Sequence, residues 1–242
     1  LELLEGQEQA FADQLRQLVE QAPENIDVLS MQAAAAQRAG ETETAIAVAR
    51  HAFKLQPDGK TLLPLITYLE ASGANAEAEK LIGAWLEDNP GDPTILLARA
   101  VNEGKQGRAD SSLSGYREVL EQQPDNFVAL NNLAWETRNE DPGQALDYAR
   151  RAVQAAPNSA AALDTLAVVE FINGDARAAK RSIQKALELA PDIPSLRYNE
   201  AMIDNALGDT ESARRVLEEI LTVSPDFPEA TEARALLQSL GG

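Results

Sequence analysis

The chain has 242 residues, of which 44 % are hydrophobic and 25 % are charged, so it can bury a core and is not expected to be disordered. Its net charge of −18 argues against a nucleic-acid partner, whose phosphates require a basic face, and disfavours an anionic membrane surface. It has no cysteines, which excludes disulfides, cysteine-bound zinc, iron–sulfur clusters and thiol nucleophiles, but fits a cytosolic and an envelope protein equally.

Prolines recur along the whole chain at nearly constant spacing. The steps between them are 34, 33, 34, 33, 34 and 34 residues. The prolines of this series are Pro23, Pro57, Pro90, Pro124, Pro157, Pro191 and Pro225. A period near 34 resembles that of the tetratricopeptide repeat, a helix–turn–helix unit. This resemblance implies an all-α fold in which the repeats stack into a right-handed α-solenoid.

We therefore predict one solenoid over residues 1–242. Residues 1–23 hold the end of one helix and a complete second helix of a partial repeat. The full repeats are 26–57, 59–90, 93–124, 126–157, 160–191 and 194–225. Residues 228–240 form a more polar capping helix, which an open solenoid needs to cover its last apolar face.

Small residues recur on one face of each predicted second helix, at twelve, eight and five residues before the proline. Examples are Ala45, Ala49 and Ala52; Ala145, Ala149 and Ala152; Ala179, Ile183 and Ala186; and Ala213, Leu217 and Ile220. Spacings of four and three place the members of each set on one helical face. We expect these faces to be buried where the two helices of a repeat approach closely.

The turns inside and between the repeats also have a signature. A glycine that can adopt the left-handed conformation stands seventeen residues before most prolines, at Gly6, Gly40, Gly73, Gly107, Gly174 and Gly208. Asp175 and Asp209 can then cap the second helix. The repeat that ends at Pro157 lacks this glycine, and Asp141 and Pro142 are expected to begin its second helix instead. Pro93, Pro194 and Pro228 are expected to open first helices.

The first helices carry the rest of the family pattern. Leu163, Leu166 and Ala167 of "LDTLAVVEF", and Leu130, Leu133 and Ala134 one repeat earlier, match positions that the tetratricopeptide repeat usually fills with Trp, Leu and Gly. The chain departs from the family consensus by using Ala for Gly and by lacking the consensus Trp.

The resemblance implies that first helices line a concave groove. Transferred to this chain, the groove positions are Leu97, Val101, Asn131, Trp135, Arg138, Asp164, Val168, Phe171, Tyr198, Met202 and Asn205. Trp, Tyr and Arg are common interface anchors, and Asn can pair with a peptide backbone. The alternative is that Trp135 and Phe171 only fill gaps between repeats. The second tryptophan, Trp85, stands at a core position and is expected to pack.

No catalytic or metal-binding motif appears in the sequence. The one histidine, His51, has no set of partners at metal spacing and is expected on the surface. "EDNPGDP" (Glu87–Pro93) is acidic but lacks the ligand pattern of a calcium loop. We therefore expect no enzyme activity, no cofactor and no metal.

The C-terminal half has a closer resemblance. "LNNLAW", "ALDYARRAVQAAPNS", "LDTLAVV", "APDIPSLRYNEAMI" and "DFPEATEARALLQSL" follow in this order between Asp125 and Leu240. This run resembles the tetratricopeptide lipoproteins of bacterial exopolysaccharide and PEP-CTERM/exosortase loci. It implies the periplasmic side of the cell envelope and a lipid anchor upstream of Leu1, with no membrane insertion in the sequence itself. Val168 and "RYNEA" depart from what these relatives carry.

The leading hypothesis is a non-catalytic scaffold that binds a peptide or protein segment in the groove. A structural or self-associating solenoid and an adaptor of a cytoplasmic complex are the alternatives. A clamp for carboxylate tails is disfavoured, because Arg138 and Arg197 are too few and Asp164 lies between them.

Overall fold

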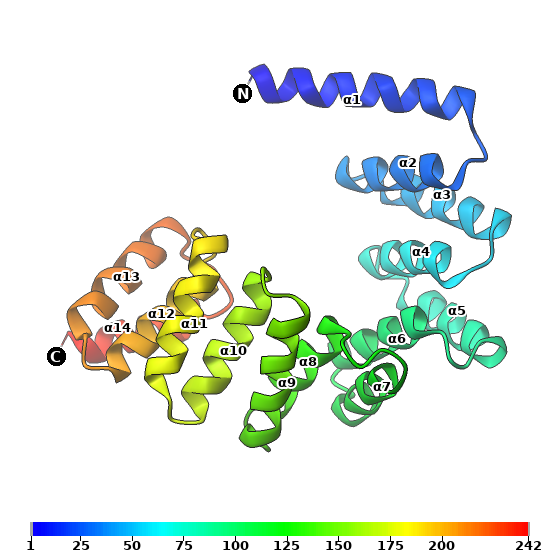
Figure 1. The fold of residues 1–242 in the computed structure, drawn as a ribbon. Helices are drawn as coiled ribbons and strands as arrows, with labels where there is room; N and C mark the ends of the chain where they lie inside the picture. The colour runs from blue at the N-terminus through cyan, green and yellow to red at the C-terminus, as the bar shows by residue number, and fades with distance from the viewer. Residues whose placement is uncertain (1, 242) are drawn as a thin grey trace. The chain divides into compact units, whose positions relative to one another are not determined.

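The structure is a computed structural model that describes residues 2–241, with side chains from residue 10 onward. Fourteen α-helices and no strands make up these residues (Figure 1). The helices are α1 Glu2–Gln21, α2 Ile26–Arg38, α3 Thr42–Leu55, α4 Gly59–Ala71, α5 Asn75–Asp88, α6 Pro93–Lys105, α7 Ala109–Gln122, α8 Phe127–Thr137, α9 Pro142–Ala155, α10 Ala160–Ile172, α11 Ala176–Leu189, α12 Pro194–Ala206, α13 Thr210–Val223 and α14 Ala230–Leu240.

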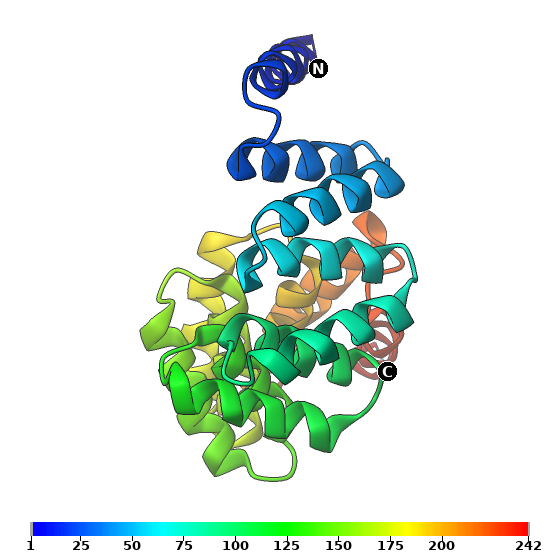
Figure 2. The same cartoon turned by 90° about the vertical axis from the view of Figure 1, so that its right-hand side faces the viewer.

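The chain divides into two compact units, residues 1–115 and residues 116–242. In the first unit, the hairpin of α2 and α3 stacks on that of α4 and α5, and α4 also contacts α6 (Figures 1 and 2). In the second unit, α8 with α9, α10 with α11 and α12 with α13 form successive hairpins, followed by α14. The fold class is therefore that of a helical-repeat solenoid, as predicted. The prediction that one array runs through the whole chain stays a prediction.

The alanine faces are buried as predicted. Ala145, Ala149 and Ala152 of α9 have no exposed surface, and neither do Ala179 and Ala186 of α11. Because the alanine side chain is a single methyl group, the two helices of a hairpin can pack closely against each other.

Enlarging one of these alanines is expected to destabilise the second unit. Ala179→Leu should lower the free energy of unfolding by about 1–3 kcal/mol, because three added carbons enter a space that is already filled. Urea unfolding followed by circular dichroism measures the change. Ala155→Leu, at an exposed position of α9, is the matched control and should leave stability nearly unchanged. Equal stability of the two variants would show that the α11 face is loosely packed.

The predicted turn signals hold with two exceptions. Gly40, Gly73, Gly107, Gly174 and Gly208 all have positive φ, between 74° and 89°. Each ends a first helix in a conformation that other residues adopt at a cost. Gly6 does not act in this way, because α1 runs through it without a break.

The second exception concerns Pro228. Pro93, Pro142 and Pro194 occupy the first turn of α6, α9 and α12, as expected. The last helix, however, begins at Ala230, because Phe227 turns its ring into the core and the residues between form a turn. The predicted capping helix therefore starts two residues later than Pro228.

Trp85 packs, as predicted. Its ring meets Phe53 edge to face, with 5.9 Å between centroids. Its indole N–H donates to Asp92 Oδ2 at 2.8 Å, and Asp92 in turn caps α6. A Cβ on Gly59 would lie 2.3 Å from the same carboxylate oxygen, so this glycine makes room for the joint between α5 and α6.

Candidate functional site

Helix α8 presents Trp135 to solvent because its other face is fully used by the core. The Asn126 side chain caps the helix by accepting a hydrogen bond from the Ala129 amide at 3.1 Å. Leu130, Leu133 and Ala134 are completely buried, as the sequence predicted. Trp135 follows directly and is 38 % exposed. Such exposure is large for a residue type that usually packs, so its position is a reason to look for a partner.

Arg138 holds the Trp135 ring in place. The guanidinium carbon lies 3.9 Å from the ring centroid, and an η nitrogen also donates to the Trp135 carbonyl oxygen. Burial lowers the pKa of the Arg138 guanidinium, although nearby Glu136 opposes the effect. A cation over an indole contributes about 0.5–1 kcal/mol at an exposed site. The two side chains therefore form an ordered pair whose fixed orientation reduces the entropy lost on binding.

Two hydrogen bonds between polar side chains connect α12 with α10 and with the residue before α14. Asn199 of α12 donates to Asp164 Oδ1 of α10 at 2.8 Å. Ser195 of α12 donates to Glu229 Oε2, just before α14, at 2.7 Å. Burial raises the pKa of the Asp164 carboxyl to about 6, the hydrogen bond from Asn199 opposes this, and the charge of Glu229 adds to it. The carboxyl of Asp164 therefore changes charge close to neutral pH.

Two of the predicted groove residues are buried instead of exposed. Tyr198 is 8 % exposed and Val168 is 9 % exposed. The Tyr198 ring lies 6.3 Å from that of Phe227 and belongs to a core cluster with residues of α13 and α14. Burial raises the pKa of the Tyr198 hydroxyl, and Glu232 and Glu229 raise it further. Because the Phe227 segment and α14 cover this end of the array, Tyr198 packs where its counterparts in earlier repeats face outward.

Phe171 also leans into the core, where it packs against the cluster of Leu163, Ile183 and Leu196. For Phe171, the structure therefore agrees with the alternative that the side chain fills a gap between repeats. The remaining predicted residues of the second unit are Asn131, Trp135, Arg138, Asp164, Met202 and Asn205, all at least partly exposed. Of these, Met202 also packs against the core cluster that contains Tyr198. We call these six residues the first-helix surface. Because α8 contacts α10 and α10 contacts α12, they lie on neighbouring helices.

Asn131 adds an unusual feature to this surface. Its Oδ1 atom is buried and accepts no hydrogen bond. A buried amide oxygen without a hydrogen-bond donor costs free energy in the folded chain.

Leu97 and Val101 lie in the first unit, where both are half-buried on α6. The same unit contains a polar pocket of about 410 Å³ between α4 and α6, which neither Leu97 nor Val101 lines. Its lining residues are Thr67, Glu70, Ala71, Asn75, Asn102, Lys105 and Gln106. All of these residues belong to the first unit, whereas the first-helix surface belongs to the second.

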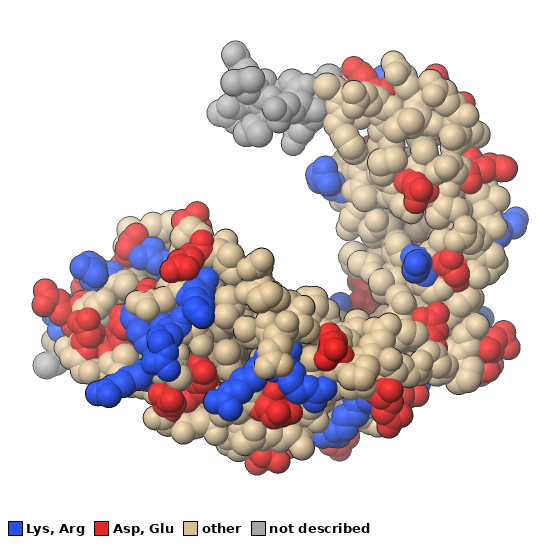
Figure 3. Space-filling view, in the orientation of Figure 1, with Lys and Arg blue, Asp and Glu red and all other residues tan. Residues whose placement is uncertain are grey.

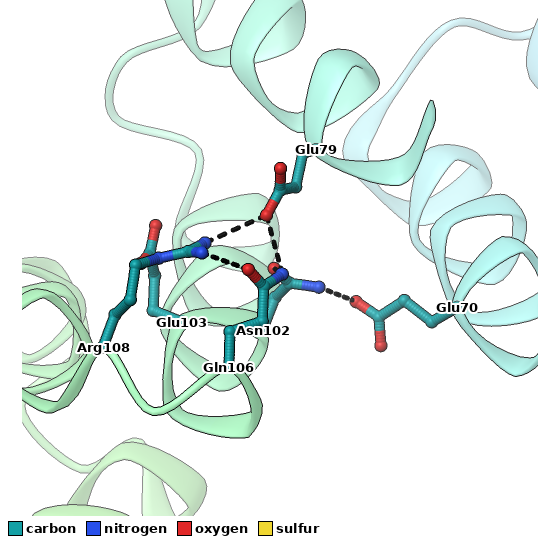
Figure 4. A network of polar contacts seen from close by, with 6 residues as sticks. All are labelled: Glu70, Glu79, Asn102, Glu103, Gln106 and Arg108. Carbon is teal, nitrogen blue, oxygen red and sulfur yellow. Dashed lines mark hydrogen bonds and ion pairs between the residues drawn. The ribbon is translucent and has the colours of Figure 1, made fainter. Parts of the chain in front are cut away.

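A network of polar side chains borders the pocket (Figure 4). Asn102 is 4 % exposed and donates to Glu70 Oε1 at 2.9 Å, while Lys105 donates to the other oxygen of Glu70 at 2.8 Å. Gln106 donates to Asn102 and to Glu79 Oε1, at 2.6 and 2.7 Å.

Arg108 completes the network by contacting Glu79, Glu103 and Gln106. The hydrogen bond from the Gln106 amide, together with the hydrogen bond and the charge of Arg108, lowers the pKa of the Glu79 carboxyl. The hydrogen-bonding groups of this network pair with one another, and these contacts connect α4, α5 and α6. This network is not predicted from the sequence, where its one signal is the asparagine inside the apolar run "LLARAVNEG".

The residues that the structure describes contain no group of three or more His, Cys, Asp and Glu side chains placed to hold a metal ion. His51 lies exposed on α3. Over the same residues, no helix combines the length and the apolar character needed to cross a membrane.

Comparison with known proteins identifies the class of fold. Residues 170–237 match the family model described as tetratricopeptide repeat. The chain is similar in structure to PilF of Pseudomonas aeruginosa, with a TM-score of 0.71, 14 % identity and coverage of 87 % of this chain and 96 % of that one. It is also similar to a tetratricopeptide repeat protein of Parabacteroides merdae, with a TM-score of 0.67, 18 % identity and coverage of 89 % and 86 %.

A third similar structure is from the Cut9–Hcn1 heterotetramer of the APC/C, with a TM-score of 0.80 and 15 % identity. It matches 98 % of this chain, which spans 46 % of the length of that one. No curated protein sequence matches the chain. These findings agree with a helical-repeat solenoid fold, in which residues 170–237 match the tetratricopeptide repeat.

Proposed function

We propose that the chain is a non-catalytic scaffold whose first-helix surface holds a peptide or protein segment of a partner. The observation that carries this proposal is Trp135, which is 38 % exposed and fixed under Arg138. An aromatic ring with a fixed orientation next to amide and carboxyl groups can bury apolar area and hydrogen-bond a backbone at once.

The neighbouring groups suit a polypeptide. The side chains of Asn131 and Asn205 are both partly exposed on this surface. Asp164 supplies an acceptor beside them. A peptide backbone presents alternating donors and acceptors, which this set of groups can meet.

We further propose that the protein works in the bacterial cell envelope, on the periplasmic side, in an exopolysaccharide-export or protein-sorting system. The support is the resemblance of Asp125–Leu240 to the tetratricopeptide lipoproteins of such loci. A self-associating solenoid is the second candidate, because Leu189, Ile193 and Val223 of the second unit are exposed apolar residues that a copy could cover.

The double variant Trp135→Ala, Arg138→Ala is expected to lose the partner. Immobilised wild type and variant are compared by affinity capture from an envelope extract, with mass spectrometry as the readout. Removing one aromatic anchor at an interface centre costs about 2 kcal/mol or more, which corresponds to at least about thirtyfold weaker binding.

The matched control is Leu189→Ala, Val223→Ala, which removes exposed apolar side chains elsewhere in the same unit. Circular dichroism shows whether each variant is folded. Retention of the same protein by wild type and by the control, with its loss by the Trp135 variant, supports the proposal. Equal retention by all three would refute it, and capture of the chain itself would favour the self-associating solenoid.

A further inference from the structure

Helix α11, which contributes no residue to the first-helix surface, has an exposed face of its own. Ala179, Ile183 and Ala186 turn one side of the helix into the core. Arg177, Arg181 and Lys185 are exposed on another side and are separated by four residues each. We call these three residues the basic row. Lys and Arg side chains gather visibly over α11 in Figure 3, on a chain that is otherwise acidic.

The basic row is free of ion pairs in a protein rich in carboxylates. The chain has 39 acidic and 21 basic residues. Elsewhere in the second unit, cations do find carboxylates: Lys180 pairs with Asp204 at 2.6 Å, and Arg197 pairs with Glu219 at 2.7 Å. No hydrogen bond or ion pair engages the three residues of the row within the described chain. Their charges are therefore available to a group from outside.

The spacing of the row indicates what it fits. Four residues along an α-helix correspond to about 6 Å, so the three charges span about 12 Å. Every second side chain of an extended peptide, on one side of its backbone, recurs at about the same distance. Arg in particular pairs with carboxylates through two parallel hydrogen bonds.

The length of the row favours a short acidic segment over a large anionic surface. Exposed acidic residues bound it along the helix, with Asp175 at the start and Glu188 near the end. A nucleic-acid duplex or an anionic membrane would extend beyond the row onto a chain of net charge −18, which would repel it. We propose that the basic row binds a short acidic segment of a partner polypeptide, at a site separate from the first-helix surface.

The test measures binding of a fluorescein-labelled hexaglutamate peptide by fluorescence anisotropy in low-salt buffer. The variant Arg177→Gln, Arg181→Gln, Lys185→Gln removes the row. The control Arg38→Gln, Lys54→Gln, Lys60→Gln removes three exposed cations of the first unit and changes the net charge equally. Hexaglutamine with the same label reports binding that does not depend on charge. Vesicles with anionic lipid and a DNA duplex serve as the other anionic probes.

The row variant should bind hexaglutamate about tenfold more weakly than wild type, while the control should differ by less than about twofold. Salt should weaken the wild-type interaction, because the charges are exposed. The proposal is overturned if wild type shows no saturable binding, or if both variants lose it equally. It is also overturned if vesicles or the duplex bind the row more tightly than the peptide does.

Discussion

Lys180→Met is expected to lower the free energy of unfolding by about 3 kcal/mol, because it leaves the buried Asp204 carboxylate without its cation. The Lys180 ammonium lies 2.6 Å from Asp204 and 2.9 Å from Glu200. The Asp204 side chain is only 6 % exposed. Burial by itself lowers the pKa of Lys180, but the hydrogen bonds to Asp204 and Glu200 outweigh it and raise that pKa. The ion pair therefore joins α11 to α12 and holds the Lys180 side chain in its charged form.

Lys185→Met is the matched control for this prediction. Lys185 lies on the same helix, is exposed and has no carboxylate partner, so its replacement should change stability by less than about 0.5 kcal/mol. Adding Asp204→Asn to Lys180→Met should recover a large part of the loss, since it removes the unpaired charge. Urea unfolding at neutral pH measures all three variants. If Lys180→Met is as stable as Lys185→Met, the pair does not stabilise the fold.

Asp164→Asn is expected to stabilise the protein more at high pH than at low pH. The folded-state pKa of Asp164 is raised from 3.8 to about 6, chiefly by burial. The folded chain therefore binds more protons than the unfolded chain between these values, and wild-type stability falls as the pH rises through them. The full effect of this shift is about 3 kcal/mol. Asparagine stays neutral and can still accept the hydrogen bond from Asn199.

The quantity to measure is the difference in unfolding free energy between Asp164→Asn and wild type across the pH range. It should grow by about 1.4 kcal/mol between about pH 5 and about pH 8, and it should level off above about pH 7. Asp226→Asn, at an exposed position before α14, is the control and should show no such growth. A difference that is constant with pH would mean that Asp164 titrates normally in the folded chain.

The repeat architecture could be predicted because it depends on local chemistry that recurs. Pro57, Pro157 and their equivalents end second helices, glycines such as Gly174 take positive φ, and alanines such as Ala149 allow close packing. The structure at the two ends of the array is harder to predict. Gly6 and Pro228 match the repeat pattern, but the pattern alone does not show what neighbours each position has, and neither residue has the predicted role.

The candidate surface could be predicted only in part for the same reason. A position in a first helix fixes the direction of a side chain relative to its own helix, and Trp135 is exposed while Leu130 and Leu133 of the same helix are buried. It does not show what covers that side chain from outside. Tyr198 has the same position in its helix as Asn131, yet Phe227 and α14 bury it. The role of Asn102 could not be predicted because its partner Glu70 lies on another helix, 32 residues earlier in the chain.

The most direct test of the first-helix surface is site-specific photocrosslinking from Asn205. A photoreactive phenylalanine analogue replaces Asn205 in one sample and Val223, which is 76 % exposed away from this surface, in another. Both proteins are irradiated in an envelope extract, and the products are separated and identified by mass spectrometry. We predict one partner polypeptide that is crosslinked from position 205 and not from position 223, and that disappears when Trp135 is also replaced by alanine. Crosslinks that are equal at both positions, or that persist without Trp135, would contradict a partner site on the first helices of the second unit.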